Sequence, residues 1–513
     1  MTRVRAVLLT FSLFFPVVPL GSASEPEKKE NGPVSYYKEV RPLFQQHCQG
    51  CHQPAKPLGG YVMTAYADLL KKADHELPGV VPGQPEKSLL VEQITTKTGK
   101  RAAMPKGKDP LPDKDVALVR RWVAEGAKDD TPKSARDPVD AEHPPVYNLP
   151  PVIPSVAFSP DGKLIAVAGF HEVLLHKGDG SGLVARLVGL SERIQSVAFS
   201  PDGKWLAAAG GSPARFGEIQ LWEVESRKLK MSIPVTFDTV YGLSWSHDSS
   251  KVAVGCADNT LRAFDVATGK QILFQGAHND WVLGTAFSKD SRFLVSVSRD
   301  RTVKLTEVAT QRFIDNVTSI TPGALKGGLL AIILQPQPPS HYAAGLAGLV
   351  AGPGAPTALL GATAAPARLF DDALIFGGSD GVPRLYKMHR TRKRVIGDDF
   401  NKIREYAALP GRIYALATRP DGEWFAAGSS LDGSGEVRVF KTSDASQVSK
   451  LEGQPGPIYS LSWRPDGKVL ASAGFDGIVR LSDPASGKVI KEFMPVPLAP
   501  PNQAGRVSAA DSR

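Results

Sequence analysis

The chain has 513 residues, a length that predicts two or more domains rather than one compact unit. Its 49 glycines and 42 prolines make it rich in turns and exclude an all-helical protein. The net charge of +9 is small for this length. No Lys/Arg run or basic helix indicates a nucleic-acid groove, so no nucleic-acid partner is expected. Three cysteines are too few for a disulfide framework, and two of them stand close together, which indicates a motif.

The first 23 residues have the pattern of a secretory signal peptide. Arg3 and Arg5 precede an apolar run from Ala6 to Leu20, and small residues follow up to Ala23, where cleavage is expected. A membrane anchor is the alternative, but the run is short for a bilayer span and Pro16 interrupts it. The mature protein is therefore expected to be periplasmic or otherwise exported, with no membrane span after removal of the signal.

Residues 33–128 carry the pattern of a small all-α domain. A first helix follows Ser35, and a second helix opens at Asp113 or Asp115 and stops at Gly126. Residues 129–151 are rich in proline and poor in apolar residues, which predicts a semi-extended linker. The predicted apolar faces are Tyr36, Val40, Leu43 and Phe44 in the first helix and Val116, Val119, Trp122 and Val123 in the second.

Beyond residue 151 a four-residue turn recurs 41 to 46 residues apart, except for one gap of 131 residues. That gap is about three steps long and is expected to hold one enlarged blade, traced by residues 374–381. Four short strands in each repeat predict an all-β propeller of seven blades over residues 152–497. An uncharged insertion at about 327–367, with no strand beyond one near Leu329 to Leu334, is expected outside its body, and residues 498–513 form a tail. The turns are Ser159–Gly162, Ser200–Gly203, Ser246–Ser249, Ser288–Ser291, Arg419–Gly422 and Arg464–Gly467.

These repeats resemble the WD40 family over roughly residues 152–493. In the best single repeat, His278 and Asp300 match the histidine and turn aspartate that hydrogen-bond within a blade of that family. The dipeptide that names the family is degraded, as in Thr306-Glu307. The resemblance implies a propeller that binds a protein partner or holds the chain in a complex.

The motif Cys48-Gln49-Gly50-Cys51-His52 carries the chemistry. C-x-x-C-H is the attachment signature of a c-type haem: both thiols bond to the haem vinyl groups, and the histidine is the proximal iron ligand. A redox dithiol has no use for the histidine. A zinc site would need a second ligand pair, and the only other cysteine, Cys256, is expected to be buried in a blade. The motif therefore predicts one covalently attached haem c, held by Cys48, Cys51 and His52.

A sixth ligand is expected downstream, from Met63, His75 or Met104, because His47 is too close to the attachment turn. Residues 35–127 resemble the planctomycete-type cytochrome c domain in the C-x-x-C-H motif, residues 81–90, the Met104-Pro105 loop and residues 121–126. The resemblance implies that Met104 is the distal ligand. Ligation by His and Met leaves no open coordination position and favours electron transfer over catalysis.

Basic residues surround this loop and could steer an acidic partner toward a haem edge, although a solvated loop without a role is the alternative. They are Lys97, Lys100, Arg101, Lys106 and Lys108.

The expected function is that of an exported c-type cytochrome that carries one electron at a time. The propeller is expected to serve as a platform for a protein redox partner or complex. No catalytic residue is assigned, so a carrier and interaction module is expected rather than a catalyst. The alternatives are an oxidoreductase with an active centre in the propeller and a scaffold whose haem is structural or sensory.

Overall fold

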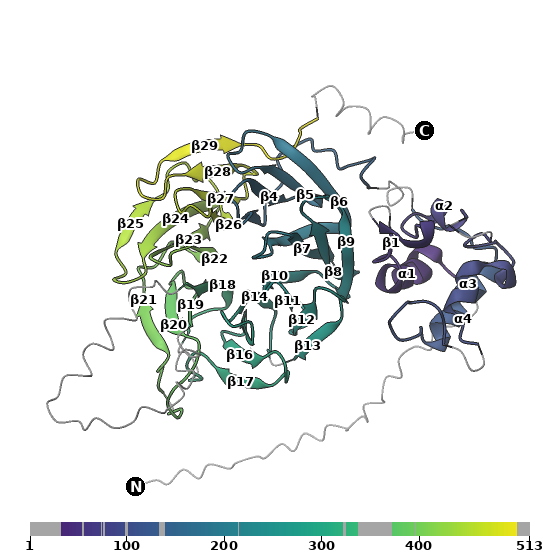
Figure 1. Cartoon of the computed structure of the whole chain (residues 1–513), viewed down its shortest axis with the longest axis horizontal. Helices are drawn as coiled ribbons and strands as arrows, with labels where there is room; N and C mark the ends of the chain where they lie inside the picture. Colours follow the sequence, from purple (N-terminus) through teal and green to yellow (C-terminus); the bar gives the residue numbers. More distant parts are fainter. Residues whose placement is uncertain are drawn as a thin grey trace, which may run out of the picture.

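The computed structural model describes residues 32–53, 56–72, 74, 77–97, 101–132, 139–213, 215–276, 278–321, 325–336, 372–395 and 397–499. The signal peptide expected at residues 1–23 and most of the tail expected at 498–513 lie outside the described residues. No helix within the described ranges is long and apolar enough to cross a membrane. Figure 1 shows a helical region, residues 32–132, beside a ring of β-sheets formed by the chain beyond residue 151.

The helical region consists of short helices joined by long irregular segments. It also contains an antiparallel pair, β1 (His52–Gln53) and β2 (Lys56–Pro57), which corrects the expectation of an all-α region. The chain reverses direction directly after His52, and strand pairing satisfies backbone groups at this reversal. The helices are a π-helical turn at Tyr36–Val40, α1 (Arg41–His47), α2 (Tyr66–Leu69), α3 (Leu89–Ile94) and α4 (Asp113–Ala124), with 3-10 turns at Leu58–Gly60 and Pro85–Lys87.

Both helices predicted from the sequence are present, and local signals explain them. The Ser35 hydroxyl accepts a hydrogen bond from the Lys38 backbone N–H (3.0 Å), and the Ser35 N–H donates to the Glu39 carboxylate (2.9 Å). This reciprocal pair caps the first turn. Two acidic residues stand in the first turn of α4, and Gly126 follows its end with a φ of 98°, a conformation that favours glycine.

One apolar cluster holds the helical region together. Trp122 of α4 stacks on Tyr36 with 5.3 Å between the ring centroids, and Phe44 of α1 meets the same indole edge-on. All three side chains are buried, so the predicted apolar faces of the two helices meet here.

The described chain beyond residue 151 forms one seven-stranded sheet and five four-stranded sheets, in which every strand pairs antiparallel with its neighbours. The seven-stranded sheet contains β3 (Val156–Phe158), β4 (Leu164–Ala168), β5 (Phe170–Lys177), β6 (Leu183–Phe199), β7 (Trp205–Ser212), β8 (Phe216–Glu223) and β9 (Leu229–Thr236). The next two sheets contain β10 (Val240–Trp245), β11 (Lys251–Cys256), β12 (Leu261–Asp265) and β13 (Gln271–Gln275), then β14 (Val282–Phe287), β15 (Phe293–Ser298), β16 (Val303–Glu307) and β17 (Phe313–Asn316).

The last three sheets follow the same order along the chain. They contain β18 (Leu329–Gln335), β19 (Ala373–Gly378), β20 (Arg384–Lys387) and β21 (Lys402–Glu405), then β22 (Arg412–Thr418), β23 (Trp424–Leu431), β24 (Ser434–Lys441) and β25 (Gln447–Lys450), then β26 (Ile458–Trp463), β27 (Leu470–Gly474), β28 (Val479–Ser482) and β29 (Val489–Phe493). Figure 1 shows the sheets side by side around a central space. The long strand β6 is the reason that seven strands form one sheet, because its first half pairs with β5 and its second half with β7.

The six repeated turns share one hydrogen-bond arrangement. In each of the first four turns the serine hydroxyl donates to the aspartate two residues later at 2.6 Å, as Ser159 does to Asp161. In the last two turns an arginine side chain replaces the serine as the donor to the aspartate. The fourth turn residue has a positive φ in every case, and Ser249 and Ser291 adopt it where the other turns have glycine.

The gap of 131 residues holds one sheet, as expected, but the expected insertion begins too early. Its first residues form β18, which pairs with β19 through Leu334 and Leu374. The strand expected near Leu329 to Leu334 is present, but it belongs to the ring, because it pairs with β19 and buries Leu329 and Ile332. The insertion therefore starts after Pro336, and its residues 337–371 lie outside the described residues. The excess length belongs to this segment, so the division of the gap into three equal steps is wrong.

The ring closes where its first and last sheets meet. The backbone N–H of Val156 in β3 donates to the Ser460 hydroxyl in β26 (2.9 Å), and the N–H of Ile153 donates to the Gly474 carbonyl (2.9 Å). The last sheet takes all four strands from residues 458–493, with no strand from the N-terminal side. A single parallel β-bridge outside the sheet joins Tyr147, before the first strand of the ring, to Leu498, after β29.

Candidate functional site

The two motif cysteines and the histidine lie on one tight turn at the end of α1. The backbone N–H groups of Cys51 and His52 both donate to the Cys48 carbonyl, at 3.0 and 3.1 Å. This turn holds the two sulfur-bearing residues and the imidazole close together in sequence and in space. Cys48 packs against the apolar cluster of the helical region, whereas Cys51 is exposed.

The His52 imidazole has a fixed orientation. Its Nδ1–H donates to the carbonyl oxygen of Tyr61 (3.1 Å), since a carbonyl can only accept. The His52 carbonyl accepts a hydrogen bond from the Met63 N–H (2.8 Å), so the backbone is held too. Burial lowers the pKa of His52, which favours the neutral ring. The arrangement leaves Nε2 with its lone pair available to a metal, the tautomer that metal-binding histidines use.

The Cys48 thiol is less acidic than a redox-active thiol of a C-x-x-C motif. Burial, together with the neighbouring Cys51 thiol, raises its pKa to about 12, and Lys108 opposes this only in part. Redox-active cysteines in C-x-x-C motifs have a lowered pKa instead. No group of three or more His, Cys, Asp or Glu side chains suited to a metal ion occurs among the described residues, so the zinc alternative lacks its ligands there. Cys256 is buried in β11, as expected.

Of the candidates for the sixth ligand, Met104 borders the same apolar cluster as Cys48 of the attachment turn. Met104 is only partly buried and packs against the apolar cluster, while its N–H donates to the Gln93 carbonyl (3.0 Å). Its peptide bond to Pro105 is cis.

The other candidates differ from Met104 in their surroundings. Met63 is 2% exposed and is enclosed by the apolar cluster, so its thioether serves as core. His47 ends α1, directly before Cys48. His75 lies outside the described residues.

The basic residues around the Met104 loop do not all act as free charges. Lys97 pairs with Glu92 (2.8 Å) and Arg101 with Asp109 (2.9 Å). Exposed Lys106 and Lys108 remain on the described part of the loop, and Lys100 lies outside it.

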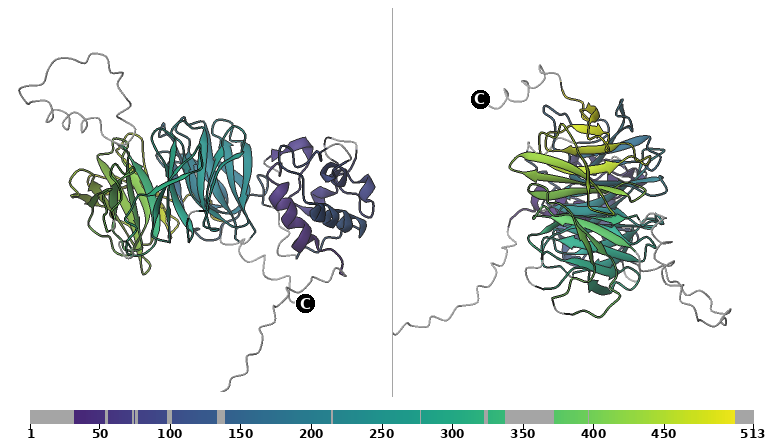
Figure 2. Two further views of the ribbon diagram at one scale, coloured as in Figure 1. Left: turned by 90° about the horizontal axis from the view of Figure 1, so that it is seen from below. Right: turned by 90° about the vertical axis from the view of Figure 1, so that its left-hand side faces the viewer.

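Gly50, between the two cysteines, makes a contact with the ring that the sequence does not reveal. A Cβ on Gly50 would lie 2.9 Å from the Ser232 carbonyl oxygen and 3.5 Å from the Pro234 ring, both in β9. The attachment turn therefore packs directly on the outer strand of a sheet in the ring, and β2 lies against the same strand. Figures 1 and 2 show the helical region beside this part of the ring. A second contact joins Arg215 of the ring to the Tyr37 hydroxyl (3.2 Å).

The ring histidine predicted from the WD40 resemblance has a structural role. His278 Nδ1 lies 2.9 Å from the Asp300 carboxylate, and its Nε2 lies 2.8 Å from the Ser296 hydroxyl. The side chains of His278 and Asp300 are buried, at 1% and 6% exposure. Thr306 stands on β16 in place of the family's tryptophan and is buried without a hydrogen-bond partner for its hydroxyl among the described residues.

The sequence also holds a basic run at residues 389–394, which corrects the expectation that no such run exists. Arg390 pairs with Asp398 (2.9 Å) and Arg394 with Asp315 (2.9 Å). Arg392 lies over the Phe400 ring, 5.2 Å from its centroid. Part of this run is therefore bound within the ring.

Comparison with known families matches this division of the chain. Residues 48–107 match the family described as Planctomycete cytochrome C. Residues 182–212, 228–265 and 269–306 match the WD domain, G-beta repeat, and residues 432–497 match the Anaphase-promoting complex subunit 4 WD40 domain. The chain carries a planctomycete-type cytochrome c domain followed by WD40 repeats. The fusion expected from the two resemblances is confirmed.

The relatives are similar to this chain over limited segments. WD repeat and SOCS box-containing protein 1 of Danio rerio is 35% identical over 17% of this chain and 22% of its own length. WD repeat-containing protein 91 homolog of Dictyostelium discoideum is 26% identical over 16% of this chain and 11% of its own length. Nuclear distribution protein PAC1-2 of Uncinocarpus reesii is 29% identical over 35% of this chain and 36% of its own length. The chain thus spans less than a quarter of the first two relatives.

Proposed function

We propose that this protein is an exported c-type cytochrome that carries one electron at a time, with the WD40 repeats as a platform for a protein redox partner or complex. The cytochrome c domain and the repeats suggest an electron carrier joined to an interaction module. The fixed His52 tautomer is the observation that carries the proposal, because Nδ1–H donates to Tyr61 and leaves Nε2 for iron.

The residues of the attachment turn fit one covalently bound haem. Cys48 and Cys51 would hold it by thioether bonds, and His52 and Met104 would bind its iron. When bound, the haem supplies a single iron that takes up and releases one electron. The chain's own residues orient the imidazole, keep it neutral and enclose one side of the site with the apolar cluster.

Ligation by Met104 rests on the position of its loop. Met104 and Cys48 both pack against the apolar cluster, which supports a place for the Met104 thioether at the same site. Ligation by a histidine and a methionine of the chain would favour electron transfer over binding of an external substrate.

The ring fits a seven-bladed propeller. The first strands contact one another in the closed cycle β3, β6, β10, β14, β18, β22, β26 and back to β3. The seven-stranded sheet would then be two blades that share β6, the outer strand of one blade and the inner strand of the next. We propose the domain division 33–128 for the cytochrome c domain, 129–151 for the linker and 152–497 for the propeller, with cleavage of the signal peptide after Ala23.

The test is the haem content and redox behaviour of the full chain, produced in a bacterium that attaches haem c during export. We expect one covalent haem per chain, measured by pyridine haemochrome absorbance against protein mass, and recovery in the periplasmic fraction. Redox titration should give a reversible one-electron transition. Two haems per chain would favour an enzyme, and a haem that cannot be cycled would contradict electron transfer.

A further inference from the structure

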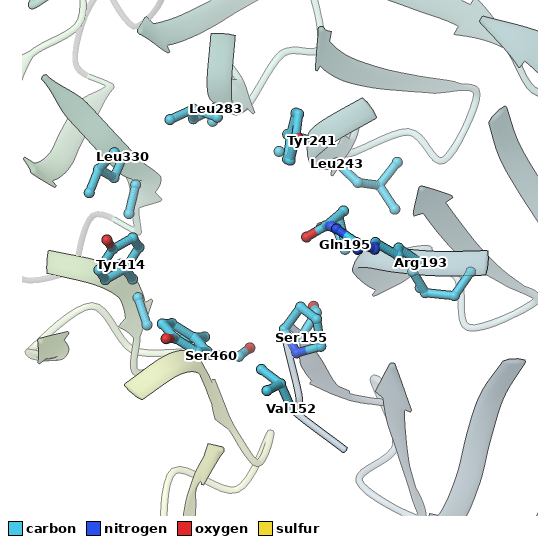
Figure 3. Close-up of a pocket in the computed structure, with 18 of the residues that line it drawn as sticks. Val152, Ser155, Arg193, Gln195, Tyr241, Leu243, Leu283, Leu330, Tyr414 and Ser460 are labelled. Carbon is cyan, nitrogen blue, oxygen red and sulfur yellow. The ribbon is translucent and has the colours of Figure 1, made fainter. Parts of the chain in front are cut away.

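The ring encloses a cavity of about 750 Å³ on its inner side. The walls come from residues of β6, β10, β14, β18, β22 and β26, together with the segment around residues 151–155. Figure 3 shows side chains from several of these strands around one common space. The volume is within the range that bound ligands occupy in proteins.

The same backbone irregularity occurs in six strands of this wall. In each strand the pairing with the next strand shifts register near its start, which is the mark of a β-bulge. A bulge interrupts the regular alternation of side chains along a strand and changes the direction in which a side chain points. The residues skipped by these shifts all line the cavity, and we call this set the collar: Gln195, Gly242, Leu243, Leu283, Leu330, Tyr414 and Tyr459.

The collar has an apolar half and a polar half. Leu243, Leu283 and Leu330 come from three consecutive sheets, and Tyr414, Tyr459 and Gln195 come from the remaining ones. Figure 3 shows Gln195 with Arg193 across the space from Tyr414 and Leu330. A ligand that fits the collar must therefore offer both apolar and polar surface.

Four polar side chains of the wall can donate hydrogen bonds to a ligand. Within the described ranges, no hydrogen bond or ion pair engages the Arg193 guanidinium, the Gln195 amide or the hydroxyls of Tyr414 and Tyr459. The carboxylate of the wall, Glu192, pairs with Arg215 (3.4 Å). Arg193 is therefore a positive charge in the wall without an ionic partner in the described part of the chain.

Tyr241 extends this donor set. Its hydroxyl has no hydrogen-bond partner among the residues described, and its ring stacks on Trp281 with 5.9 Å between centroids. Burial and the Asp238 carboxylate raise the pKa of this phenol, and the Arg193 guanidinium opposes them in part. The phenol is thus protonated at neutral pH and can donate beside the guanidinium.

We propose that the cavity binds an acidic side chain, Asp or Glu, presented by an extended segment of a partner protein with apolar residues beside it. The inference deepens the proposed role of the repeats in protein binding and rests on it. A carboxylate accepts charge-assisted hydrogen bonds from a guanidinium and further bonds from phenols and an amide. Leu283 and Leu330, the partly exposed leucines of the collar, take the apolar neighbours, whereas a basic segment would be repelled by Arg193.

The test is isothermal titration calorimetry of the haem-loaded full chain with two capped pentapeptides, Ser-Leu-Glu-Leu-Ser and its twin with Gln in place of Glu. We expect the Glu peptide to bind about tenfold more tightly, the effect of one charge-assisted hydrogen bond. Arg193→Gln should remove this preference, and Leu283→Ser should weaken both peptides. Added salt should weaken the Glu peptide, since the cavity is open to solvent. Arg312→Gln, at an exposed arginine outside the cavity, is the matched control and should change neither affinity.

Three results would overturn the inference. They are equal affinity for the two peptides, no binding of either peptide, and an unchanged preference in Arg193→Gln. Sodium acetate that competes as well as the Glu peptide would assign the site to small carboxylates instead of a partner segment. Haem content and redox cycling are measured on the same samples. Loss of cycling with intact peptide binding would refute electron transfer alone, and the reverse would refute the cavity alone.

Discussion

In the helical region a single apolar cluster joins residues from Val34 to Ala127, whereas in the ring separate clusters lie between successive pairs of sheets. The ring builds its stability from repeated strand pairing, and each sheet adds its own hydrogen bonds and its own interface. The helical region has few regular backbone hydrogen bonds, and its packing depends on one apolar cluster. The motif cysteines and the motif histidine therefore lie in the part of the molecule that has the least regular backbone pairing. We expect the two regions to unfold in separate transitions.

The largest effect should come from removing both attachment sulfurs. Cys48→Ser with Cys51→Ser should abolish covalent haem and destabilise the helical region by about 3–4 kcal/mol, because a tightly bound group stabilises the fold that binds it. Differential scanning calorimetry should show one transition shifted and the transition of the ring unchanged.

Cys256→Ala is the control for the double variant Cys48→Ser with Cys51→Ser, because Cys256 is buried in β11 within the ring. It should leave haem content unchanged and lower the stability of the ring by about 1 kcal/mol. If loss of haem shifts both transitions equally, the two regions are not independent.

Substitution of Met63 and Met104 in the helical region should distinguish a core side chain from an iron ligand. Met63→Ala should cost about 2–5 kcal/mol in stability, because Met63 is buried in the apolar cluster. Met104→Ala should cost less in stability but should lower the reduction potential, because a thioether favours ferrous iron. Absorbance spectra and redox titration of both variants provide the measurement.

The weak far-red band of Met-ligated ferric haem should vanish in Met104→Ala and survive in Met63→Ala. Met104→His should keep six ligands and shift the potential downward as well. The opposite pattern for the band would assign the ligand to Met63.

A buried carboxylate in the ring should make the stability of the ring depend on pH. Burial alone would raise the pKa of Asp300, but hydrogen bonds from His278, the Asn279 N–H and Thr302 outweigh burial and hold this pKa well below its usual range. The folded pKa is thus below the unfolded value of about 3.9. The stabilisation is present above that value and is lost as the pH falls through the folded pKa.

Asp300→Asn should therefore cost about 1–3 kcal/mol at pH 7. The difference from the wild type should shrink by about 1.4 kcal/mol for each pH unit below about pH 4. Urea unfolding of the ring at pH 7 and pH 3 tests this, and a difference that is the same at both values would refute it.

The smallest effect concerns the contact between the two regions. Gly50→Ala places a methyl group against the Ser232 carbonyl and should weaken the contact by about 1 kcal/mol. Haem content should not change, while the amides of β9 should exchange hydrogen several times faster. Gly276→Ala is the matched control, because a Cβ there meets no atom within 4 Å. Unchanged exchange in β9 would mean that the contact adds nothing to the stability of β9.

Sequence patterns predicted features that depend on neighbouring residues. Ser35 and Gly126 mark helix ends through contacts within a few residues, and the turn at Ser159–Gly162 closes through its own hydroxyl and carboxylate. The attachment motif is equally local. These signals do not require knowledge of the rest of the fold.

Contacts between distant residues escaped prediction. Gly50 meets Ser232 only because the two regions pack together, and nothing near Gly50 in the sequence encodes this. The role of Leu329–Gln335 as an inner strand depends on pairing with β19 across the insertion. The collar depends on register shifts between strands, which become evident only when each strand is paired with the next.

The continuous strand β6 has a consequence for how the ring opens. Elsewhere two successive sheets are separate hydrogen-bonded ladders, and one can fray while its neighbour stays closed. Leu183–Phe199 instead carries one unbroken strand from the sheet edge at β5 into the pairing with β7. The strands β3 to β9 should therefore behave as one cooperative unit, with a shared protection against hydrogen exchange. The cytochrome c domain rests on β9 at the edge of this unit, so its attachment turn lies against the largest sheet in the described part of the ring.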